Sequence, residues 1–343
     1  MDKIAIVVGI CGMDGEAAGY FLLEKGYKVI GTYRKNSFID LESVKEKYNS
    51  PNFSLEHCEI TDFNSVKVLL NTCLEKHGKI DEIYLLAAQS QVGISFDASE
   101  TTVLTNGMSA YNFLESLRLL TPKTKLYFAA TSELLGGDPA KCPFDENSDY
   151  ECRSPYAIGK ELGTRFVKYY RQTYGIFACY GILFNHSNNS RGLSFFSRRI
   201  TQAAARISLG KQKELELGTL DFWRDEHWAD FGVEMMWKML QQEDPETFVI
   251  CNGLAIHGEQ FLDEAFNYFN LNWRDYVKID SSRFRPNEVI KLVGNPQKAI
   301  NKLGWLPNRI SIKTHMGLMC KHDYELESGN KPKRPEVFKL FPR

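Results

Sequence analysis

Apolar and polar positions in the first half of the chain follow two alternating periods. Short apolar runs are typical of buried strands, and they cover Lys3–Val8, Lys28–Tyr33, Phe53–Glu56, Glu82–Leu86, Lys125–Ala130 and Ala178–Leu183. Helical spacing lies between them and covers Glu16–Lys25, Ser65–Lys76, Thr101–Leu119 and Pro155–Tyr174. Strands separated by helices predict an α/β fold, with a Rossmann-like doubly wound parallel sheet.

This alternation ends after Asn185, where residues 188–192 (NNSRG) form a turn-rich stretch. A helix is expected near Phe195–Leu209 and a strand near Phe248–Cys251, and Pro and Gly punctuate Phe284–Pro307. A chain of 343 residues suits one large domain with a smaller lobe. We expect a first domain over residues 1–185 with a later contribution from about 225–255, a mixed α/β substrate lobe over 186–224 and 256–325, and a C-terminal tail over 326–343.

Composition narrows the functional classes. The net charge is −1, from 42 Lys and Arg against 43 Asp and Glu, without the basic excess of nucleic-acid-binding proteins. No apolar run reaches the ~20 residues of a membrane helix, and the N-terminus lacks the pattern of a signal peptide. The eight Cys are scattered without a CxxC pair, and no His, Cys and acidic cluster has metal spacing. We expect a cytoplasmic protein without a metal, nucleic-acid or membrane partner.

Three glycines follow the first predicted strand and open the first helix. They are Gly9, Gly12 and Gly15, in a GxxGxxG spacing. Glycine allows a tight turn and a close approach of the backbone to a pyrophosphate, which then lies at the helix N-terminus. An ordinary glycine-rich turn is the alternative, but the strand–turn–helix context favours a dinucleotide site.

The second predicted strand is followed by Arg34, Lys35 and Asn36. A site for NAD commonly places an acidic residue here for the ribose hydroxyls. Two cations beside a small polar side chain instead suit the 2′-phosphate of NADP. A solvated basic loop is the alternative. We expect NADP as the cofactor and the first domain as its binding domain.

Two further segments carry groups that indicate acid–base chemistry. Tyr156 and Lys160 lie four residues apart at the start of a predicted helix and therefore share one face. A nearby ammonium group lowers the pKa of a tyrosine hydroxyl from its usual value of about 10, so Tyr156 can act as a general base. A bare YxxxK spacing often marks only a helix surface. Here it follows a strand end rich in hydroxyl and carboxyl groups, which comprises Thr131, Ser132 and Glu133.

Together these motifs resemble an extended short-chain dehydrogenase/reductase and, more narrowly, the GDP-mannose 4,6-dehydratase family. The glycine loop is shared by the whole superfamily, whereas the TSE and GILFNH segments are more specific. The similarity runs from about residue 3 to about residue 308. The matching segments are Phe21–Tyr27, Thr131–Leu134, Arg153–Ala157, Gly181–His186, Arg191-Gly192, Arg285–Val289 and Leu303–Pro307.

The resemblance implies a mechanism. Tyr156 takes the proton of the sugar C4 hydroxyl while the C4 hydride passes to the nicotinamide. Glu133 removes the C5 proton, and the C6 hydroxyl departs with a proton from Glu133 or Ser132. Return of the hydride to C6 gives a 4-keto-6-deoxy sugar. A simple reductase or epimerase needs no such additional carboxylate, so Glu133 favours elimination. A solvated loop acid is the alternative interpretation of Glu133.

The resemblance also extends the predicted binding sites. It implies that Lys160 holds the nicotinamide ribose. Cofactor contacts are implied for Met13, Asp14, Asp62, Ala87, Gln89, Tyr156 and Lys160. Substrate contacts are implied for Ser90, Asn185, Arg191, Arg199, Arg224, Arg285 and Glu288. Arginine suits a nucleotide diphosphate because its planar fork pairs with phosphate oxygens. The predicted partner is therefore a nucleotide-diphosphate sugar, with GDP as the expected nucleotide, while the choice between Arg198 and Arg199 as the inward side chain stays open.

Several positions depart from the family pattern. Residues 36–58 are shorter than the family loop that helps to form a tetramer, and residues 224–230 (RDEHWAD) differ after their first two positions. Single departures are Val8, Cys11, Met13 and Gln91. The sugar therefore stays open between GDP-mannose and a related GDP-sugar such as GDP-heptose. We expect a homodimer through helices near Thr101–Leu119 and Pro155–Tyr174, with a tetramer left open, and structural hydrogen bonds from His186 and His227.

Two other functions compete with the dehydratase. One is a nucleotide-sugar 4-epimerase or 4-keto reductase of the same superfamily, which would form an epimer reversibly or consume NADPH. The other is a non-catalytic NADP-binding regulator on the same fold, since fold alone does not prove activity. A regulator predicts erosion of the reactive side chains, but Tyr156, Lys160 and Glu133 are all present.

Overall fold

A computed structural model describes residues 2–35, 40–284 and 286–342 of the chain. Two compact units emerge, and each is described by itself. The first comprises Met1–Leu134, Asp149–Leu183 and Asp230–Ile250, and the second comprises Leu135–Ser148, Phe184–Ala229 and Cys251–Arg343. Over the described ranges, no helix combines the length and the apolar character needed to cross a membrane.

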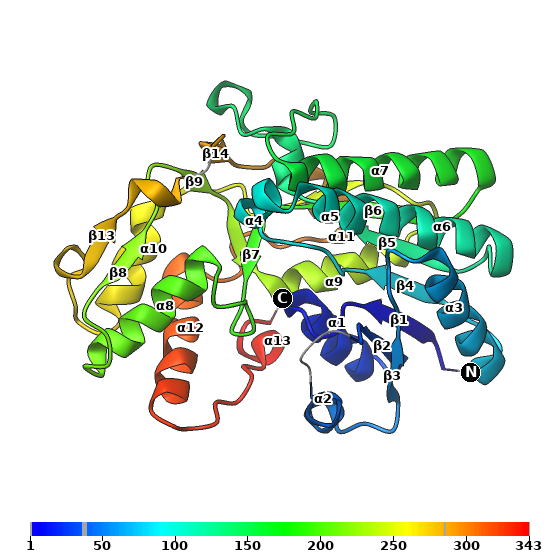
Figure 1. Ribbon diagram of the computed structural model, residues 1–343, viewed down its shortest axis with the longest axis horizontal. Helices are drawn as coiled ribbons and strands as arrows, with labels where there is room; N and C mark the ends of the chain where they lie inside the picture. The colour runs from blue at the N-terminus through cyan, green and yellow to red at the C-terminus, as the bar shows by residue number, and fades with distance from the viewer. Residues whose placement is uncertain (1, 36–39, 285, 343) are drawn as a thin grey trace. The chain divides into compact units, whose positions relative to one another are not determined.

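The first unit is built on a seven-stranded parallel sheet, which confirms the predicted doubly wound fold (Figure 1). Its strand order is β11-β6-β5-β4-β1-β2-β3. In the register of the central strands, Ile6 of β1 lies opposite Ile30 of β2 and Ile83 of β4. The strands are β1 (Ile4–Val8), β2 (Lys28–Tyr33), β3 (Phe53–His57), β4 (Glu82–Leu85), β5 (Lys125–Ala129), β6 (Ala178–Leu183) and β11 (Phe248–Ile250). Strands buried on both faces explain why the sequence shows apolar runs rather than strict alternation.

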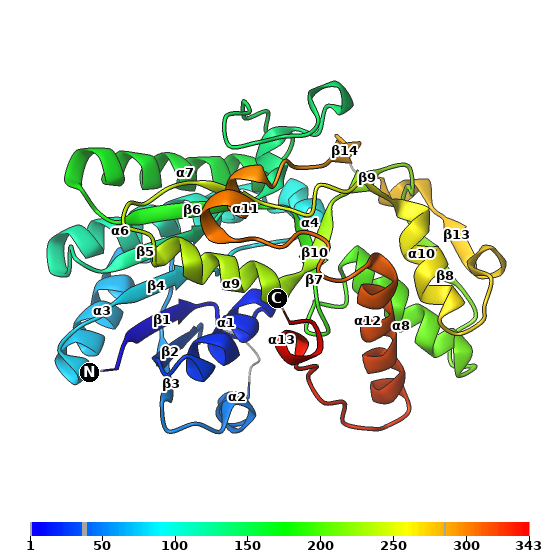
Figure 2. The same cartoon turned by 180° about the vertical axis from the view of Figure 1, so that it is seen from behind.

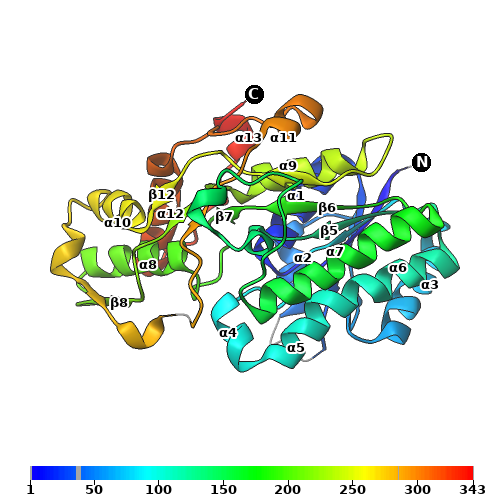
Figure 3. The same ribbon diagram turned by 90° about the horizontal axis from the view of Figure 1, so that it is seen from above.

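Helices cover both faces of this sheet, as the views from behind and from above show (Figures 2 and 3). On one face α1 packs against α9, with the rings of Phe21 and Trp237 5.9 Å apart. The other face carries α3, α6 and α7, which contact one another in that order. The bounds are α1 (Met13–Glu24), α2 (Leu41–Tyr48), α3 (Phe63–His77), α4 (Val92–Asp97), α5 (Ser99–Val103), the π-helical turn η1 (Leu104–Met108), α6 (Ser109–Leu120), the 3₁₀ turn η2 (Ser132–Leu135), α7 (Pro155–Tyr174) and α9 (Ala229–Leu240).

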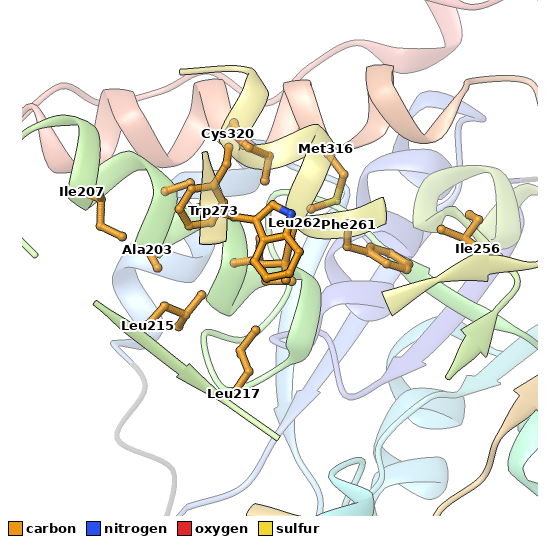
Figure 4. Close-up of a cluster of buried hydrophobic side chains, with 14 residues drawn as sticks. Ala203, Ile207, Leu215, Leu217, Ile256, Phe261, Leu262, Trp273, Met316 and Cys320 are labelled. Atoms are coloured by element: carbon orange, nitrogen blue, oxygen red, sulfur yellow. The ribbon is translucent and has the colours of Figure 1, made fainter. Parts of the chain in front are cut away.

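The second unit contains three small sheets and a helical core. The sheets pair β7 (Asn185–Ser187) with β10 (Glu226–Trp228), β9 (Trp223–Arg224) with both β12 (Ile256–His257) and β14 (Lys291–Leu292), and β8 (Leu215–Leu217) with β13 (Val277–Ile279). The helices are α8 (Phe196–Ser208), α10 (Gly258–Asn267), α11 (Gln297–Leu303), α12 (Ile312–Glu327) and α13 (Val337–Leu340), with 3₁₀ turns η3 (Pro139–Lys141), η4 (Trp273–Asp275) and η5 (Ser281–Arg283). Side chains of α8, α10 and α12 bury one apolar cluster around Phe261, Trp273 and Met316 (Figure 4).

The unit boundaries differ in detail from the predicted domains. Residues 135–148 belong to the second unit because Phe144 pairs with the chain that follows β14: its amide donates to the Val293 carbonyl (2.9 Å) and its carbonyl accepts from the Asn295 amide (2.8 Å). The predicted tail contains the end of α12 and all of α13, where Val337 is buried. Assignment of the cofactor to one unit and of the sugar nucleotide to the other stays a prediction.

Candidate active site

Two of the glycines after β1 are required by close packing. Gly9 has φ +94°, and a Cβ there would lie 2.9 Å from Cα of Ala87. A Cβ at Gly15 would lie 2.0 Å from the carbonyl oxygen of Gly9. The amide of Gly9 donates to Thr32 Oγ1 (3.2 Å), and the amide of Gly12 donates to the Gly9 carbonyl (3.0 Å). These contacts bring the start of α1 directly against the loop.

The third glycine leaves space for a ligand. Gly12 is exposed, and apart from its chain neighbours the one described atom within 4 Å of a Cβ built there is the Gly9 oxygen, at 3.4 Å. It is the N-cap of α1 and provides no side chain to cap the helix. First-turn amides and the helix dipole favour an anion at such an end. Because the Met13 side chain is buried, Met13 offers only its backbone, and the loop fits the pyrophosphate of a dinucleotide.

The described residues predicted to bind the rest of the cofactor also belong to the first unit. Arg34 and Lys35 are exposed directly after β2, while Asn36 lies outside the described residues. The Asp62 carboxylate caps α3 by accepting the Asn64 amide (2.9 Å). The Ala87 amide donates to the Val8 carbonyl (2.8 Å), so the chain after β4 runs along the end of β1. The sheet order reverses between β1 and β4, and this is where doubly wound sheets bind nucleotides.

Asn106 is a residue of this site that the sequence analysis missed. It is fully buried in the π-helical turn, where its side chain accepts the Gln89 amide (2.9 Å) and donates to the Gln89 carbonyl (3.0 Å). The Gln89 side chain in turn holds the amide (2.8 Å) and the carbonyl (3.1 Å) of Gln91. This clamp fixes the loop that presents Ser90, which is exposed. A polar residue on the buried face of a helix is the signal that could have identified it.

The predicted acid–base residues lie at the end of β5 and the start of α7. Thr131 and Ser132 are buried, and Glu133 is partly exposed in η2, with its amide donating to Thr131 Oγ1 (3.3 Å). Ser154 begins α7 as its N-cap and accepts the Ala157 amide (3.1 Å). This cap sets where the helix starts, and thus where Tyr156 lies on its first turn.

Lys160 joins the two segments. Its Nζ donates to the carbonyl oxygen of Ala129, the last residue of β5, at 2.7 Å. Burial lowers the pKa of Lys160 to about 8, with the Asp14 carboxylate acting in the opposite direction. The helix can lie this close because Gly159 and Gly163 have no Cβ. A Cβ at Gly163 would be 2.4 Å from the Phe128 ring, and one at Gly159 would be 3.0 Å from Asn106 Cβ. The structure therefore places the Tyr156–Lys160 helix directly beside the strand end that carries Thr131, Ser132 and Glu133.

The second unit holds most of the residues predicted to bind substrate. Arg224 is buried, and its Nη2 lies 3.5 Å from Glu288 Oε1, which brings these two predicted residues together. Arg191 lies over the Phe195 ring at 3.6 Å, Asn185 begins β7, and Arg285 lies outside the described residues.

The two adjacent arginines of α8, Arg198 and Arg199, have different partners. The buried Arg198 forms an ion pair with Asp323, with its Nη2 2.6 Å from Oδ1, and thereby joins α8 to α12. Arg199 is only partly buried and donates to the Glu216 carbonyl. Its pKa is lowered by burial and by the neighbouring Arg283 guanidinium. Arg199 is therefore the one of the two available to a ligand.

A family model described as GDP-mannose 4,6 dehydratase matches residues 6–319. Over 339 residues the chain is 39% identical to GDP-mannose 4,6 dehydratase 2 of Arabidopsis thaliana, which covers 96% of this chain and 89% of the plant protein. It is 35% identical to the GDP-mannose 4,6-dehydratase of Vibrio cholerae serotype O1, with 94% of each chain covered. The chain belongs to the GDP-mannose 4,6 dehydratase family.

Solved structures agree on the fold of this dehydratase-family chain. A Thermotoga maritima UDP-glucose 4-epimerase with UDP-glucose matches with a TM-score of 0.81 at 21% identity, covering 96% of this chain and 100% of the epimerase. A dTDP-glucose 4,6-dehydratase from Bacillus anthracis in complex with NAD matches with a TM-score of 0.80 at 19% identity, covering 96% and 99%. Pseudomonas aeruginosa RMD complexed with NADPH matches with a TM-score of 0.76 at 18% identity, covering 95% and 99%. At these identities the likeness shows the fold alone.

His186 and His227 of this dehydratase-family chain differ in their hydrogen bonds. His186 Nδ1 lies 2.7 Å from the Phe184 carbonyl, as expected of a structural hydrogen-bonding residue. The expectation is wrong for His227, whose ring nitrogens have no hydrogen-bond partner among the described residues. It stacks instead on His186 (5.2 Å) and packs against Trp305 (5.5 Å), and burial holds its pKa well below the usual range. Within the described ranges, no three His, Cys or acidic side chains group as a metal site.

Proposed function

We propose that this chain is an NADP-dependent nucleotide-sugar 4,6-dehydratase, a hydro-lyase acting on GDP-mannose or a related GDP-sugar such as GDP-heptose. The observation that carries the proposal is the Lys160–Ala129 hydrogen bond. It places the Tyr156–Lys160 helix beside the strand end that carries Glu133. Membership of the dehydratase family and the glycine loop support the same conclusion.

The choice of NADP rests on the chain after β2. Arg34 and Lys35 are exposed there, and their cations suit a 2′-phosphate. The loop around Gly12 suits the pyrophosphate because it offers first-turn amides and open space. When bound, the nicotinamide ring supplies a reversible acceptor for the hydride that leaves C4 of the sugar and returns to C6.

The protein's own groups move the protons. Tyr156 accepts the proton of the C4 hydroxyl, and the Lys160 ammonium favours the tyrosinate form that does so. Oxidation at C4 acidifies the C5 proton, which the Glu133 carboxylate removes. The C6 hydroxyl leaves as water with a proton from Glu133 or Ser132, and C5 regains a proton that exchanges with solvent when the hydride returns to C6. The Thr131 hydroxyl contacts the same end of the sugar. Each substrate loses one water, and the hydride is conserved.

The second unit binds the nucleotide end in this proposal. Arg224 contacts the diphosphate because its planar fork matches phosphate oxygens, and Glu288 accepts hydrogen bonds from ribose hydroxyls. The remaining contacts are assigned to Ser90, Asn185, Arg191, Arg199 and Arg285. The hydrogen bond between Arg199 and a backbone carbonyl leaves further guanidinium donors for an anion.

Incubation with NADP and either GDP-mannose or a GDP-heptose tests the activity. We expect a product lighter by one water, with one deuterium at C5 when the reaction runs in deuterated water, and no net formation of NADPH. An epimer of unchanged mass would favour the 4-epimerase. In a parallel incubation with NADPH and a 4-keto sugar nucleotide, stoichiometric NADPH consumption would favour the 4-keto reductase. Binding of NADP and GDP-sugar without any conversion would favour the regulator.

We also propose that the chain is a cytoplasmic homodimer. All eight Cys are free thiols, as in reducing compartments. Helices α6 and α7 expose Leu119, Ile158, Tyr169 and Tyr174, apolar side chains that a partner helix pair would cover. Multi-angle light scattering of the purified protein checks this assembly: a monomer at micromolar concentration contradicts it, and a tetramer would extend it.

A further inference from the structure

Asp225 is a fully buried acid that the proposed chemistry does not use. It directly follows Arg224 at the end of β9. Its Oδ1 accepts a hydrogen bond from the amide of Asn252 (2.6 Å), and its Oδ2 accepts one from the amide of Gly253 (2.7 Å). A longer contact of 3.4 Å joins Oδ2 to the amide of Gly294. A carboxylate that accepts several backbone amides is held rigidly and also holds the segments that donate to it.

These amides belong to the two neighbours of β9. Gly294 follows β14, which pairs in parallel with β9. Asn252 and Gly253 precede β12, which pairs antiparallel with β9. The amide of Asp225 itself donates to the Leu292 carbonyl (3.0 Å). Since β9, β12 and β14 have two residues each, their ladders contain few hydrogen bonds, and the Asp225 carboxylate supplies the contacts that close one end of the sheet.

Two of the three donors, Gly253 and Gly294, are glycines in places where a side chain would be strained or crowded. A Cβ at Gly294 would lie 2.6 Å from Cys251 Sγ and 2.9 Å from the Phe184 ring. Gly253 has φ +77°, a conformation that favours glycine. Burial raises the pKa of Asp225 to about 7, although its backbone donors act in the opposite direction. The local sequence is therefore arranged around this acid.

Arg224 depends on the same small sheet for its orientation. Its Nη1 donates to the Trp223 carbonyl (3.0 Å) and to the Ile290 carbonyl (3.4 Å), which immediately precedes β14. Its guanidinium lies 4.8 Å from the centre of the Phe222 ring. Any shift of β14 against β9 would move the Ile290 carbonyl and turn the guanidinium away from its present direction.

We propose that Asp225 is a positioning residue, which orients Arg224 toward the diphosphate of the nucleotide sugar by locking β9 to β12 and β14. The inference rests on the proposed function, because that function assigns the diphosphate to Arg224. Removing the carboxylate leaves the amides of Asn252, Gly253 and Gly294 without this acceptor. The acid–base residues belong to the first unit, so the loss falls on nucleotide binding rather than on the chemical step.

The holoenzyme with NADP bound is compared as wild type, Asp225→Asn and Asp323→Asn. The control Asp323 is an equally buried acid of the second unit, and it binds Arg198 and Thr201, which both lie on α8 rather than in the β9 sheet. For Asp225→Asn we expect KM for the GDP-sugar and Kd for free GDP to rise about 10- to 100-fold, the size expected when a hydrogen bond to a charged group is lost. Its kcat and NADP affinity are expected to stay within about threefold of wild type. Asp323→Asn should lower stability and leave KM and Kd unchanged, and an equal rise in both variants would overturn the proposal.

A double-mutant cycle with Arg224→Lys tests the positioning role of Asp225 separately from the assignment of the diphosphate to Arg224. If Asp225 acts through Arg224, Asp225→Asn changes GDP affinity less than about twofold in the Arg224→Lys background. Full additivity would reject the positioning role and leave the proposed function standing. An unchanged GDP affinity in Arg224→Lys alone would reject the diphosphate role of Arg224. Should Asp225→Asn fail to fold, Asp225→Glu keeps the charge but displaces it by one methylene, and a wild-type Kd for GDP in that variant would contradict the proposal.

Discussion

Lys160, which the proposed chemistry requires, lowers the free energy of unfolding of the protein without ligands. Lys160 is 3% exposed, and its Nζ donates to the Ala129 carbonyl and lies 4.9 Å from the centre of the Phe128 ring. Burial lowers its pKa from 10.5 to about 8, a difference of 2.5 between the two values. At about 1.36 kcal/mol per pKa unit, this difference corresponds to about 3 kcal/mol of unfolding free energy lost while the group is charged.

Replacement by methionine removes the charge and keeps an unbranched side chain of similar length. It also removes a hydrogen bond from a charged donor, worth about 1.5–3 kcal/mol. At pH 7 we therefore expect Lys160→Met to be as stable as wild type or up to about 2 kcal/mol more stable, because the two terms oppose each other. Its turnover should be lost, because Tyr156 no longer has a cation beside it.

The pH dependence of the stability difference between Lys160→Met and wild type reports the cost of burying the Lys160 charge. Below pH 8 the lysine is protonated in both folded and unfolded chains, so wild type carries the whole penalty. Between pH 8 and 10.5 the unfolded chain binds more protons, so the stability of wild type rises with pH. The advantage of Lys160→Met should shrink by about 3 kcal/mol across this range.

Urea unfolding of the protein without cofactor, followed between about pH 7 and pH 10, measures this difference. The matched control is Lys168→Met, which removes an exposed lysine from the same helix and should track wild type at every pH. A stability difference between Lys160→Met and wild type that stays constant with pH would refute the reasoning. It would mean that the Lys160 ammonium is not desolvated in the folded protein.

Three further variants test the proposed site. Tyr156→Phe should keep NADP binding and lose at least about 100-fold in kcat, as expected for loss of a general base, and near-normal turnover would remove Tyr156 from the mechanism. Glu133→Gln should still bind the GDP-sugar and show transient NADPH absorbance without forming the 6-deoxy product, whereas dehydration at the wild-type rate would contradict elimination through Glu133. Neutral replacement of both Arg34 and Lys35 should weaken NADP much more than NAD in a fluorescence titration, and equal weakening would reject the 2′-phosphate assignment.

The core of the first unit could be predicted because its signals are local. Apolar runs of strand length identified every strand of the large sheet, including β11 from the second half of the chain, and three closely spaced glycines marked the loop proposed to bind the cofactor. The i, i+4 spacing of Tyr156 and Lys160 was enough to place both on one helix face, since the helical period fixes that geometry. The second unit was harder to predict, because strands of two or three residues leave no periodic signal in the sequence.

The sequence by itself determined the parallel sheet and the glycine loop and identified the candidate acid–base side chains, because each depends on residues that are neighbours along the chain. Only the tertiary structure decided what those side chains contact. Arg198 forms an ion pair with Asp323, Arg199 donates to the Glu216 carbonyl, and the Asn106 side chain binds the backbone of Gln89. The tertiary structure also surrounds Asp225 with amides from segments 27 to 69 residues away. Such contacts depend on long-range packing and on the need to satisfy buried polar groups, so no local sequence pattern predicts them.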